Sequence, residues 1–197
     1  MCYTIIIIKV ARQLNFLLTL LTVKIHLSIR KDEIDYSAPV ILMTKALEYI
    51  GNILFKKLTK NTTPPNNIFH MYKDNNGWSE HITLGNIAYL FKNQEFLSGT
   101  NDIHKLISKD RIEALEGKTV IFDNNGNKEE FKNDINKNLN VMFKALKYIA
   151  DNFRNQAAHS DLTPEQKYKK CRELVITTQH LLFVLLYIIE DGTILGD

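Results

Sequence analysis

Arg154 and His159, separated by Asn155-Gln156-Ala157-Ala158, are the residues whose types and spacing best suit chemistry in this chain. A histidine imidazole titrates near neutral pH, so it can take a proton from a ribose 2′-hydroxyl or give one to a leaving oxygen. An arginine can hold a phosphate through two hydrogen bonds and stabilise the charge that develops in the transition state. Asn155 could add a hydrogen bond or orient the arginine. The pair suits phosphodiester cleavage without a metal, and a 2′-hydroxyl nucleophile would confine the reaction to RNA.

Helix geometry limits what this pair can do within one chain. At about 100° per residue, an unbroken α-helix sets Arg154 and His159 about 140° apart, on different faces. They could converge if the helix loosens near Ala157-Ala158, or if a second copy of the chain supplies another pair. The structural alternative is that Arg154 closes a helix C-terminus, where the helix dipole favours a cation, and that His159 packs in a loop. The spacing alone leaves both interpretations open.

Other chemistries have little support in the sequence. The remaining histidines lack metal-ligand spacing with cysteines or acids, and neither usual glycine-rich phosphate loop is present, so no metal or cofactor is expected. Cys2 and Cys171 have the pattern of free thiols in a reducing compartment, and Cys171 lies on an apolar helical stripe where a core role is expected. The phosphodiester hypothesis therefore depends on Arg154 and His159.

Three long amphipathic helices would position these residues. The first begins near Ser37, which is expected to cap it, with Pro39 in its first turn, and runs for about twenty residues. The second runs from Phe131 into Arg154. The third follows a cap at Thr163 and continues unbroken to Gly192. The apolar residues that recur at three- and four-residue steps are Val40, Met43, Leu47, Ile50, Leu54 and Leu58 in the first helix, and Ile135, Leu139, Met142, Leu146, Ile149 and Phe153 in the second.

A polar line runs beside the apolar stripe of the first helix. It contains Lys45, Glu48 and Asn52, and Lys45 could pair with Glu48 at a spacing of three residues. Glu48 is either a solvated surface residue or a carboxylate that meets Arg154 across a helix interface. In the second case Lys45 and Glu48 would support the Arg154–His159 site.

Residues 60–130 form a loop-rich middle, with short helices expected at 83–91 and 101–115 and one strand at 118–122. Residues 60–130 are interpreted as an insertion that either lies over the site or is a peripheral addition without a role in it. The chain is therefore predicted to be all-α: an up-and-down helical bundle with a loop-rich insertion between the first and the last two long helices.

Residues 1–30 form an apolar, basic segment of a different character. They hold four of the 25 basic residues and none of the 22 acidic ones, which leaves 21 basic and 22 acidic residues in the remainder. The main body is therefore not a broadly basic nucleic-acid binder, and any RNA contact would be local. The segment could be an accessory helix buried against the domain or a partner, a remnant of an upstream domain, or a membrane anchor. The anchor is the less favoured reading because no 18-residue stretch lacks charge.

The motif Arg154-Asn155-Gln156-Ala157-Ala158-His159, at the end of one long helix and before another, resembles the HEPN superfamily (higher eukaryotes and prokaryotes nucleotide-binding). The signature of that superfamily is an arginine, often followed by a polar residue, with a histidine after four to six intervening residues. The helix that carries Lys45-Ala46-Leu47-Glu48 is similar to the first bundle helix of bacterial members, in which a polar or acidic residue faces the site. The resemblance covers roughly residues 35–58 and 131–190.

This resemblance implies a homodimer that brings two Arg–His sets together. It also implies, in many members, metal-independent endoribonuclease activity in phage defence, toxin–antitoxin or CRISPR-linked systems. Arg154 and His159 match the signature, Asn155 matches its polar position, and Glu48 would be a helper. Members of the toxin branch often carry a tyrosine two residues after the histidine, where this chain has Asp161. That departure argues against a nucleotidyl-modified toxin.

Two functions remain as expectations. The first is a cytoplasmic, homodimeric ribonuclease formed by residues 31–197 and acting on RNA. The second is a non-catalytic helical module that binds a nucleotide, RNA or a regulatory protein partner through the same groove, because many members of the superfamily bind without cutting.

Overall fold

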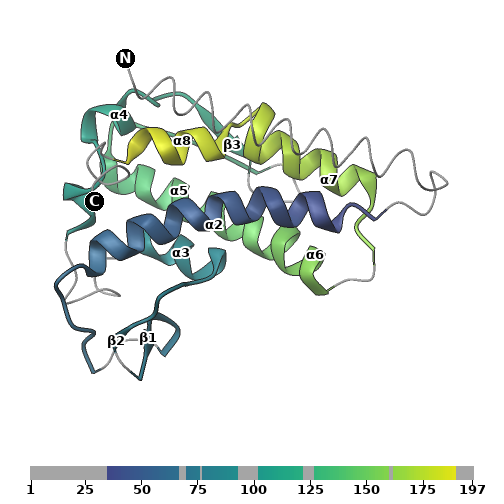
Figure 1. Cartoon of the computed structure of the whole chain (residues 1–197). Helices are drawn as coiled ribbons and strands as arrows, with labels where there is room; N and C mark the ends of the chain where they lie inside the picture. The colour runs from purple at the N-terminus through teal and green to yellow at the C-terminus, as the bar shows by residue number, and fades with distance from the viewer. Residues whose placement is uncertain are drawn as a thin grey trace, which may run out of the picture.

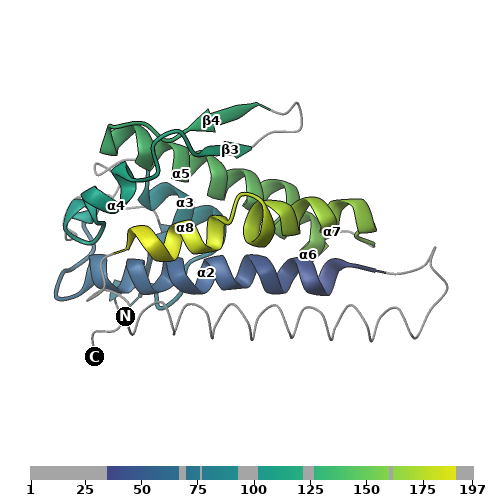
Figure 2. The same ribbon diagram turned by 90° about the horizontal axis from the view of Figure 1, so that it is seen from above.

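The computed structural model describes residues 35–66, 70–75, 77–92, 102–121, 127–159 and 162–189, and this part of the chain is mostly helical (Figures 1 and 2). The all-α class predicted from the sequence is thereby confirmed. The interpretations of residues 1–30, the membrane anchor included, fall outside the described residues, as do Cys2 and Asp161.

Three long helical stretches make up most of the fold. Helix α2 (Ser37–Thr59) is one uninterrupted helix. Helix α5 (Ile135–Ile149) continues through a π-helical turn, η5 (Ala150–Arg154), into α6 (Asn155–His159). Helix α7 (Glu165–Arg172) continues through a second π-helical turn, η6 (Glu173–Thr177), and the chain then enters α8 (Leu181–Ile188). In Figure 2, α8 lies between α2 on one side and α5 on the other.

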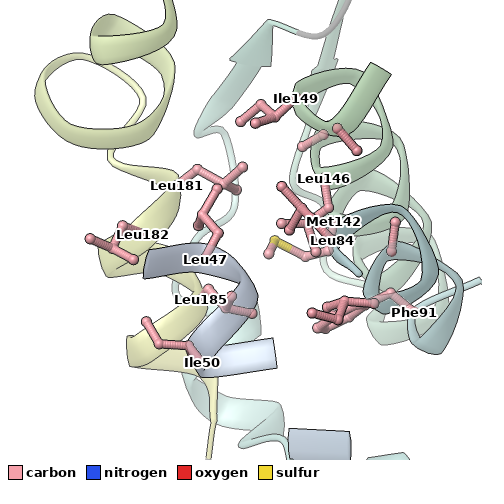
Figure 3. Close-up of a cluster of buried hydrophobic side chains, with 14 of the residues drawn as sticks. Leu47, Ile50, Leu84, Phe91, Met142, Leu146, Ile149, Leu181, Leu182 and Leu185 are labelled. Carbon is pink, nitrogen blue, oxygen red and sulfur yellow. The ribbon is translucent and has the colours of Figure 1, made fainter. Parts of the chain in front are cut away.

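The predicted apolar stripes form the core. Every predicted stripe residue of α2 is at most 6% exposed, and in α5 and η5 the same holds from Leu139 to Phe153. Figure 3 shows side chains from α2, α3, α5 and α8 meeting in one cluster, for example Leu47, Leu84, Met142 and Leu185. The hydrophobic periodicity thus predicted which face of each long helix is buried.

Helix α3 (Leu84–Leu90) is part of this core and is not a peripheral element. It was expected at 83–91, and its Leu84, Ile87 and Ala88 are fully buried between α2 and α5. Gly51 of α2 permits the approach, since a Cβ built there would lie 2.3 Å from Ile87 Cγ2. The middle of the chain therefore packs directly beneath the polar line of α2.

The other short elements match the expectations only in part. The helix expected at 101–115 is two pieces, a 3₁₀ turn η4 (Ile103–Lys105) and α4 (Lys109–Glu113). The expected strand is β3 (Thr119–Ile121), and its antiparallel partner β4 (Lys128–Glu130) was not predicted. A second small hairpin joins β1 (Lys73–Asp74) to β2 (Gly77–Trp78) after a 3₁₀ turn, η2 (His70–Tyr72). These hairpins leave the class all-α.

The prediction of one unbroken C-terminal helix is wrong. The chain bends at residues 178–180, where the N–H groups of Thr178 and Gln179 both donate to the Glu173 carbonyl and His180 takes a left-handed φ of 51°. Thr177 and Thr178 are β-branched and disfavour helix, so this is the weak point of an otherwise apolar run. The bend gives α8 a direction of its own.

Two helical stretches, residues 37–59 and 165–188, are long and apolar enough to cross a membrane by length and composition alone. The buried share of their most apolar windows is 61% and 44%. Core helices of water-soluble proteins pass the same test, so this feature carries no conclusion about location.

The start of α2 is tied to the start of α7 by Asp35. Its Oδ1 accepts hydrogen bonds from Ser37 N–H at 2.9 Å, Ser37 Oγ at 2.7 Å and Thr163 N–H at 2.9 Å. The hydroxyls of Ser37 and Thr163 lie 2.8 Å apart. We call these contacts of Asp35, Ser37 and Thr163 the Asp35 clasp. The prediction that Ser37 and Thr163 cap helices is wrong: Ser37 is the first residue of α2, and neither α2 nor α7 has a side-chain hydrogen bond at its cap. Asp35 supplies the acceptor that the sequence assigned to Ser37.

We expect Asp35→Asn to lower the unfolding temperature at neutral pH and to lose this effect in acid. Burial alone would raise the pKa of Asp35, but the hydrogen bonds from Thr163 and Ser37 outweigh it and leave the pKa below its usual value. A carboxylate with a lowered folded pKa stabilises the fold above its unfolded pKa of about 4, and the contribution disappears as the pH falls through the folded value. The clasp should contribute at most about 1 kcal/mol, since it lies near solvent.

Thermal unfolding measured from neutral pH down to about pH 3 tests this expectation. Glu80→Gln, at an exposed position in the loop between β2 and α3, is the control and should not change the unfolding temperature. A difference between wild type and Asp35→Asn that stays constant at all these pH values would contradict the assignment.

Candidate functional site

Glu48 is the centre of the candidate site. Its Oε1 accepts a hydrogen bond from Lys45 Nζ, its Oε2 lies 3.3 Å from the backbone nitrogen of Leu84, and Arg154 Nε lies 3.8 Å from Oε2. The Glu48 side chain is only 11% exposed. A carboxylate this buried needs compensating partners, which it finds in two cations and one N–H group. The contact with Arg154 that the polar line of α2 suggested is present.

The register of α2 places these groups together. Lys45, Glu48 and Asn52 follow one another at spacings of three and four residues, so they lie along one side of the helix. Asn52 donates from Nδ2 to the Ile82 carbonyl at 2.9 Å and accepts from the Ile82 N–H at 2.8 Å. This two-way pairing fixes the backbone just before α3, which carries the Leu84 N–H to Glu48.

Arg154 is the last residue of the π-helical turn η5, which positions it beside Glu48. The N–H of Asn155 donates to the carbonyl of Ala150, five residues earlier, which is the bond that defines a π turn. Phe153 anchors the turn, being 3% exposed and packed edge-on against Tyr148 with ring centroids 5.7 Å apart. A turn widened by one residue changes the direction of the side chains that follow it, and such turns often occur at functional sites. The Arg154 side chain remains 24% exposed, so it can still be reached from solvent.

The structure does not bring His159 to Arg154 within one chain. Loosening of the helix near Ala157-Ala158 was one of two ways in which the pair could converge, and it does not occur: residues 155–159 are α-helical, and the wide turn precedes them. Alanine is the strongest helix former, which explains why these positions hold the helix. Arg154 and His159 therefore lie about 140° apart around the axis of the stretch that η5 and α6 form. His159 is exposed at the end of the described helix, and no described residue hydrogen-bonds to its imidazole.

The remaining predicted residues occupy different surroundings. Asn155 is exposed at the start of α6, and Lys45 is 52% exposed while it contacts Glu48.

Three features of the site were not predicted from the sequence: the Leu84 N–H near Glu48, the two hydrogen bonds between Asn52 and Ile82, and the π turn. Asn52 stood on the same polar line as Glu48, which was a usable signal. The Leu84 contact and the π turn have no local signal, because they depend on how α3 and α5 pack.

Cys171 behaves as a core residue, as its place on an apolar stripe predicted. It is a free cysteine with no exposed surface, and burial raises the pKa of its thiol to about 12. The thiol is therefore protonated at neutral pH and unsuited to nucleophilic attack. Within the described ranges, no group of three or more histidine, cysteine, aspartate and glutamate side chains could hold a metal ion.

The candidate site is thus a buried carboxylate that holds a partly exposed arginine at the end of η5, with an exposed histidine at the end of α6, the helix labelled in Figure 1. No protein-family model matches this chain, and neither a curated protein nor a solved structure is significantly similar to it.

Proposed function

We propose that this chain is a metal-independent endoribonuclease of the HEPN type, which cleaves RNA at a site shared between two copies. In this proposal the described helices form the up-and-down bundle, residues 60–130 form its insertion, and the protein works in the cytoplasm as part of a bacterial defence or toxin system. The observation that carries the proposal is the contact of Arg154 with Glu48, which holds an arginine near solvent in the same helical stretch as His159.

The roles follow from the chemistry of each group. Arg154 binds the scissile phosphate through its outer guanidinium nitrogens, while Glu48 restrains Nε at 3.8 Å. His159 takes the proton of the ribose 2′-hydroxyl, whose oxygen attacks phosphorus. The bond to the 5′-oxygen breaks, and that oxygen receives the proton back from the same imidazole. The products are a 2′,3′-cyclic phosphate and a 5′-hydroxyl end, so no metal or water is consumed in this step.

A second copy is needed because Arg154, the last residue of η5, and His159, the last residue of α6, point to different sides of one helical stretch. His159 stands exposed at the end of α6, where another subunit can approach. If the site is composite, a mixture of inactive Arg154→Ala and His159→Ala proteins should regain activity, because each mixed dimer holds one site with both groups. Cleavage by a protein that stays monomeric at assay concentration would contradict the shared site.

The primary test is cleavage of unpaired RNA by purified protein in EDTA. We expect products that end in a 2′,3′-cyclic phosphate and no cleavage of an otherwise identical strand with a 2′-deoxyribose at the scissile position. Cleavage of the deoxyribose strand, or products with a 3′-hydroxyl, would rule out the 2′-hydroxyl mechanism.

One observation favours the alternative of a non-catalytic module that binds a nucleotide, RNA or a regulatory protein. No described residue orients the His159 imidazole, whereas Arg154 is held by Glu48. Such a module would bind without turnover, lose affinity in Arg154→Ala and keep it in His159→Ala. Binding measured on these two variants separates the alternatives.

A further inference from the structure

Tyr49 is the most exposed large hydrophobic side chain in the described part of the molecule, at 70%. It follows Glu48 on α2 but points about 100° further around the helix, on the same face as Lys45, which contacts Glu48. Every other described tyrosine has a ring or a cation against its own ring: Tyr36 and Tyr168 stack on each other, and Tyr72, Tyr89, Tyr148 and Tyr187 contact Phe55, Phe143, Phe153 and Arg111. Within the described residues the ring of Tyr49 has no such contact.

The outer face of α2 around Tyr49 is apolar and positive. Its exposed residues at helical spacing are Ala38, Leu42, Lys45, Tyr49 and Lys56. At about 100° per residue these positions fall within about 60° of the helix circumference. Lys45 lies about one turn before Tyr49, and Lys56 about two turns after it. The single acid of α2 is Glu48, which is nearly buried and engaged by Lys45 and Arg154.

We propose that Tyr49 is a stacking platform for an unpaired base of RNA bound along this face, with Lys45 and Lys56 contacting the phosphates; the proposal rests on the ribonuclease function above and assigns its substrate as single-stranded. An exposed tyrosine offers a flat π-face, and stacking of an unpaired base on an aromatic ring is a general mode of single-strand recognition. Lys45 has donors to spare, because an ammonium group carries three and the side chain is 52% exposed.

Charge favours RNA over a second copy of the chain as the occupant of this face. The face carries two lysines and no exposed acid, so two copies related by a two-fold axis would bring like charges together. A polyanion with unpaired bases satisfies both the lysines and the free ring. A homodimer that shares the active site would then use the α6 end and leave the outer face of α2 open.

The test measures binding of a short, fluorescently labelled unpaired RNA by anisotropy, in a His159→Ala background that prevents cleavage. Tyr49→Ala should weaken binding about tenfold, and Tyr49→Trp should restore it. The same sequence as a duplex should bind equally well to the protein with and without Tyr49→Ala, since paired bases cannot stack on the ring. Lys45→Gln and Lys56→Gln should each make the plot of log affinity against log salt concentration less steep, by the amount that corresponds to the loss of about one phosphate contact.

Tyr187→Ala is the matched control. Tyr187 is also exposed, at 43%, but lies on α8 with the Arg111 guanidinium over its ring, so its loss should not change RNA affinity. Unchanged affinity in Tyr49→Ala overturns the inference even if the wild type cleaves RNA. Altered oligomeric state with unchanged RNA affinity assigns the face to a second copy and overturns it too. If the wild type binds RNA through Tyr49 but does not cleave it, the inference about Tyr49 holds and the ribonuclease proposal is wrong.

Discussion

Substitution of His159 by alanine should reduce RNA cleavage about 10²- to 10⁴-fold, the range typical for loss of a general acid–base group. The fold should not change, because His159 is exposed at the end of α6 and no described residue hydrogen-bonds to its imidazole. The measurement is the initial rate of cleavage of a labelled unpaired RNA in EDTA, together with thermal unfolding of both proteins. An unchanged melting temperature with a large loss of rate would place His159 in the chemistry.

His70→Ala is the matched control for this experiment. His70 is likewise exposed, but it lies at the start of η2 beside the β1–β2 hairpin, which Figure 1 shows apart from α6. Its loss should leave the rate unchanged. If His159→Ala cleaves as fast as the wild type, the activity belongs to another group or to a contaminant, and the proposed mechanism is wrong.

The second large effect is expected from Gly51→Ala, which should lower the stability of the fold by about 2 kcal/mol. An alanine Cβ would lie 2.3 and 2.7 Å from two side-chain carbons of Ile87, well inside van der Waals contact. Ile87 is fully buried and β-branched, so it cannot rotate away without disturbing its neighbours. This overpacking outweighs the roughly 1 kcal/mol that alanine gains over glycine inside a helix. Chemical denaturation of the two proteins measures the difference.

Gly85→Ala provides the matched control on the facing helix. A Cβ there would lie 3.9 Å from its nearest neighbours, Ala150 Cβ and Thr83 Oγ1, an ordinary contact distance, so this change should be neutral or stabilising. In the double variant Gly51→Ala/Ile87→Ala the clash is removed, and the two changes should cost less together than the sum of their separate costs. Strict additivity would show that α2 and α3 do not approach at Gly51 as described.

Much of the candidate site could be predicted because its residues lie on regular helices. The steps from Lys45 to Glu48 to Asn52 put three polar groups on one line, and the stripe that ends at Phe153 put Arg154 beside the core. Both follow from helical periodicity, which needs no knowledge of the other elements. The sequence left two interpretations of Glu48, as a solvated surface residue or as a partner of Arg154. The packing of α2 against η5 brings Glu48 into contact with Arg154 and so decides for the second.

The errors lie where local preference and packing disagree. Ser37 has the residue type of a helix cap, but the nearby carboxylate of Asp35 is the better acceptor and joins α2 to Thr163, far away in sequence. Opening of the helix near Ala157-Ala158 was one of two options that the sequence left, whereas the turn that widens is η5, directly before α6. A π turn leaves no pattern in the sequence, since it is a response to how neighbouring side chains fit.

The sequence by itself therefore determined the helical class, the buried face of each long helix, and the polar line that supports Arg154. These depend on a period of 3.6 residues and on burial of apolar groups, and both are local properties of the chain. Only the tertiary structure decided that α3 fits under Gly51 and brings the Leu84 N–H to Glu48, that η5 redirects Arg154, and that His159 remains apart from it. Those outcomes depend on close packing between segments distant in sequence, where differences of tenths of an ångström decide which contacts form.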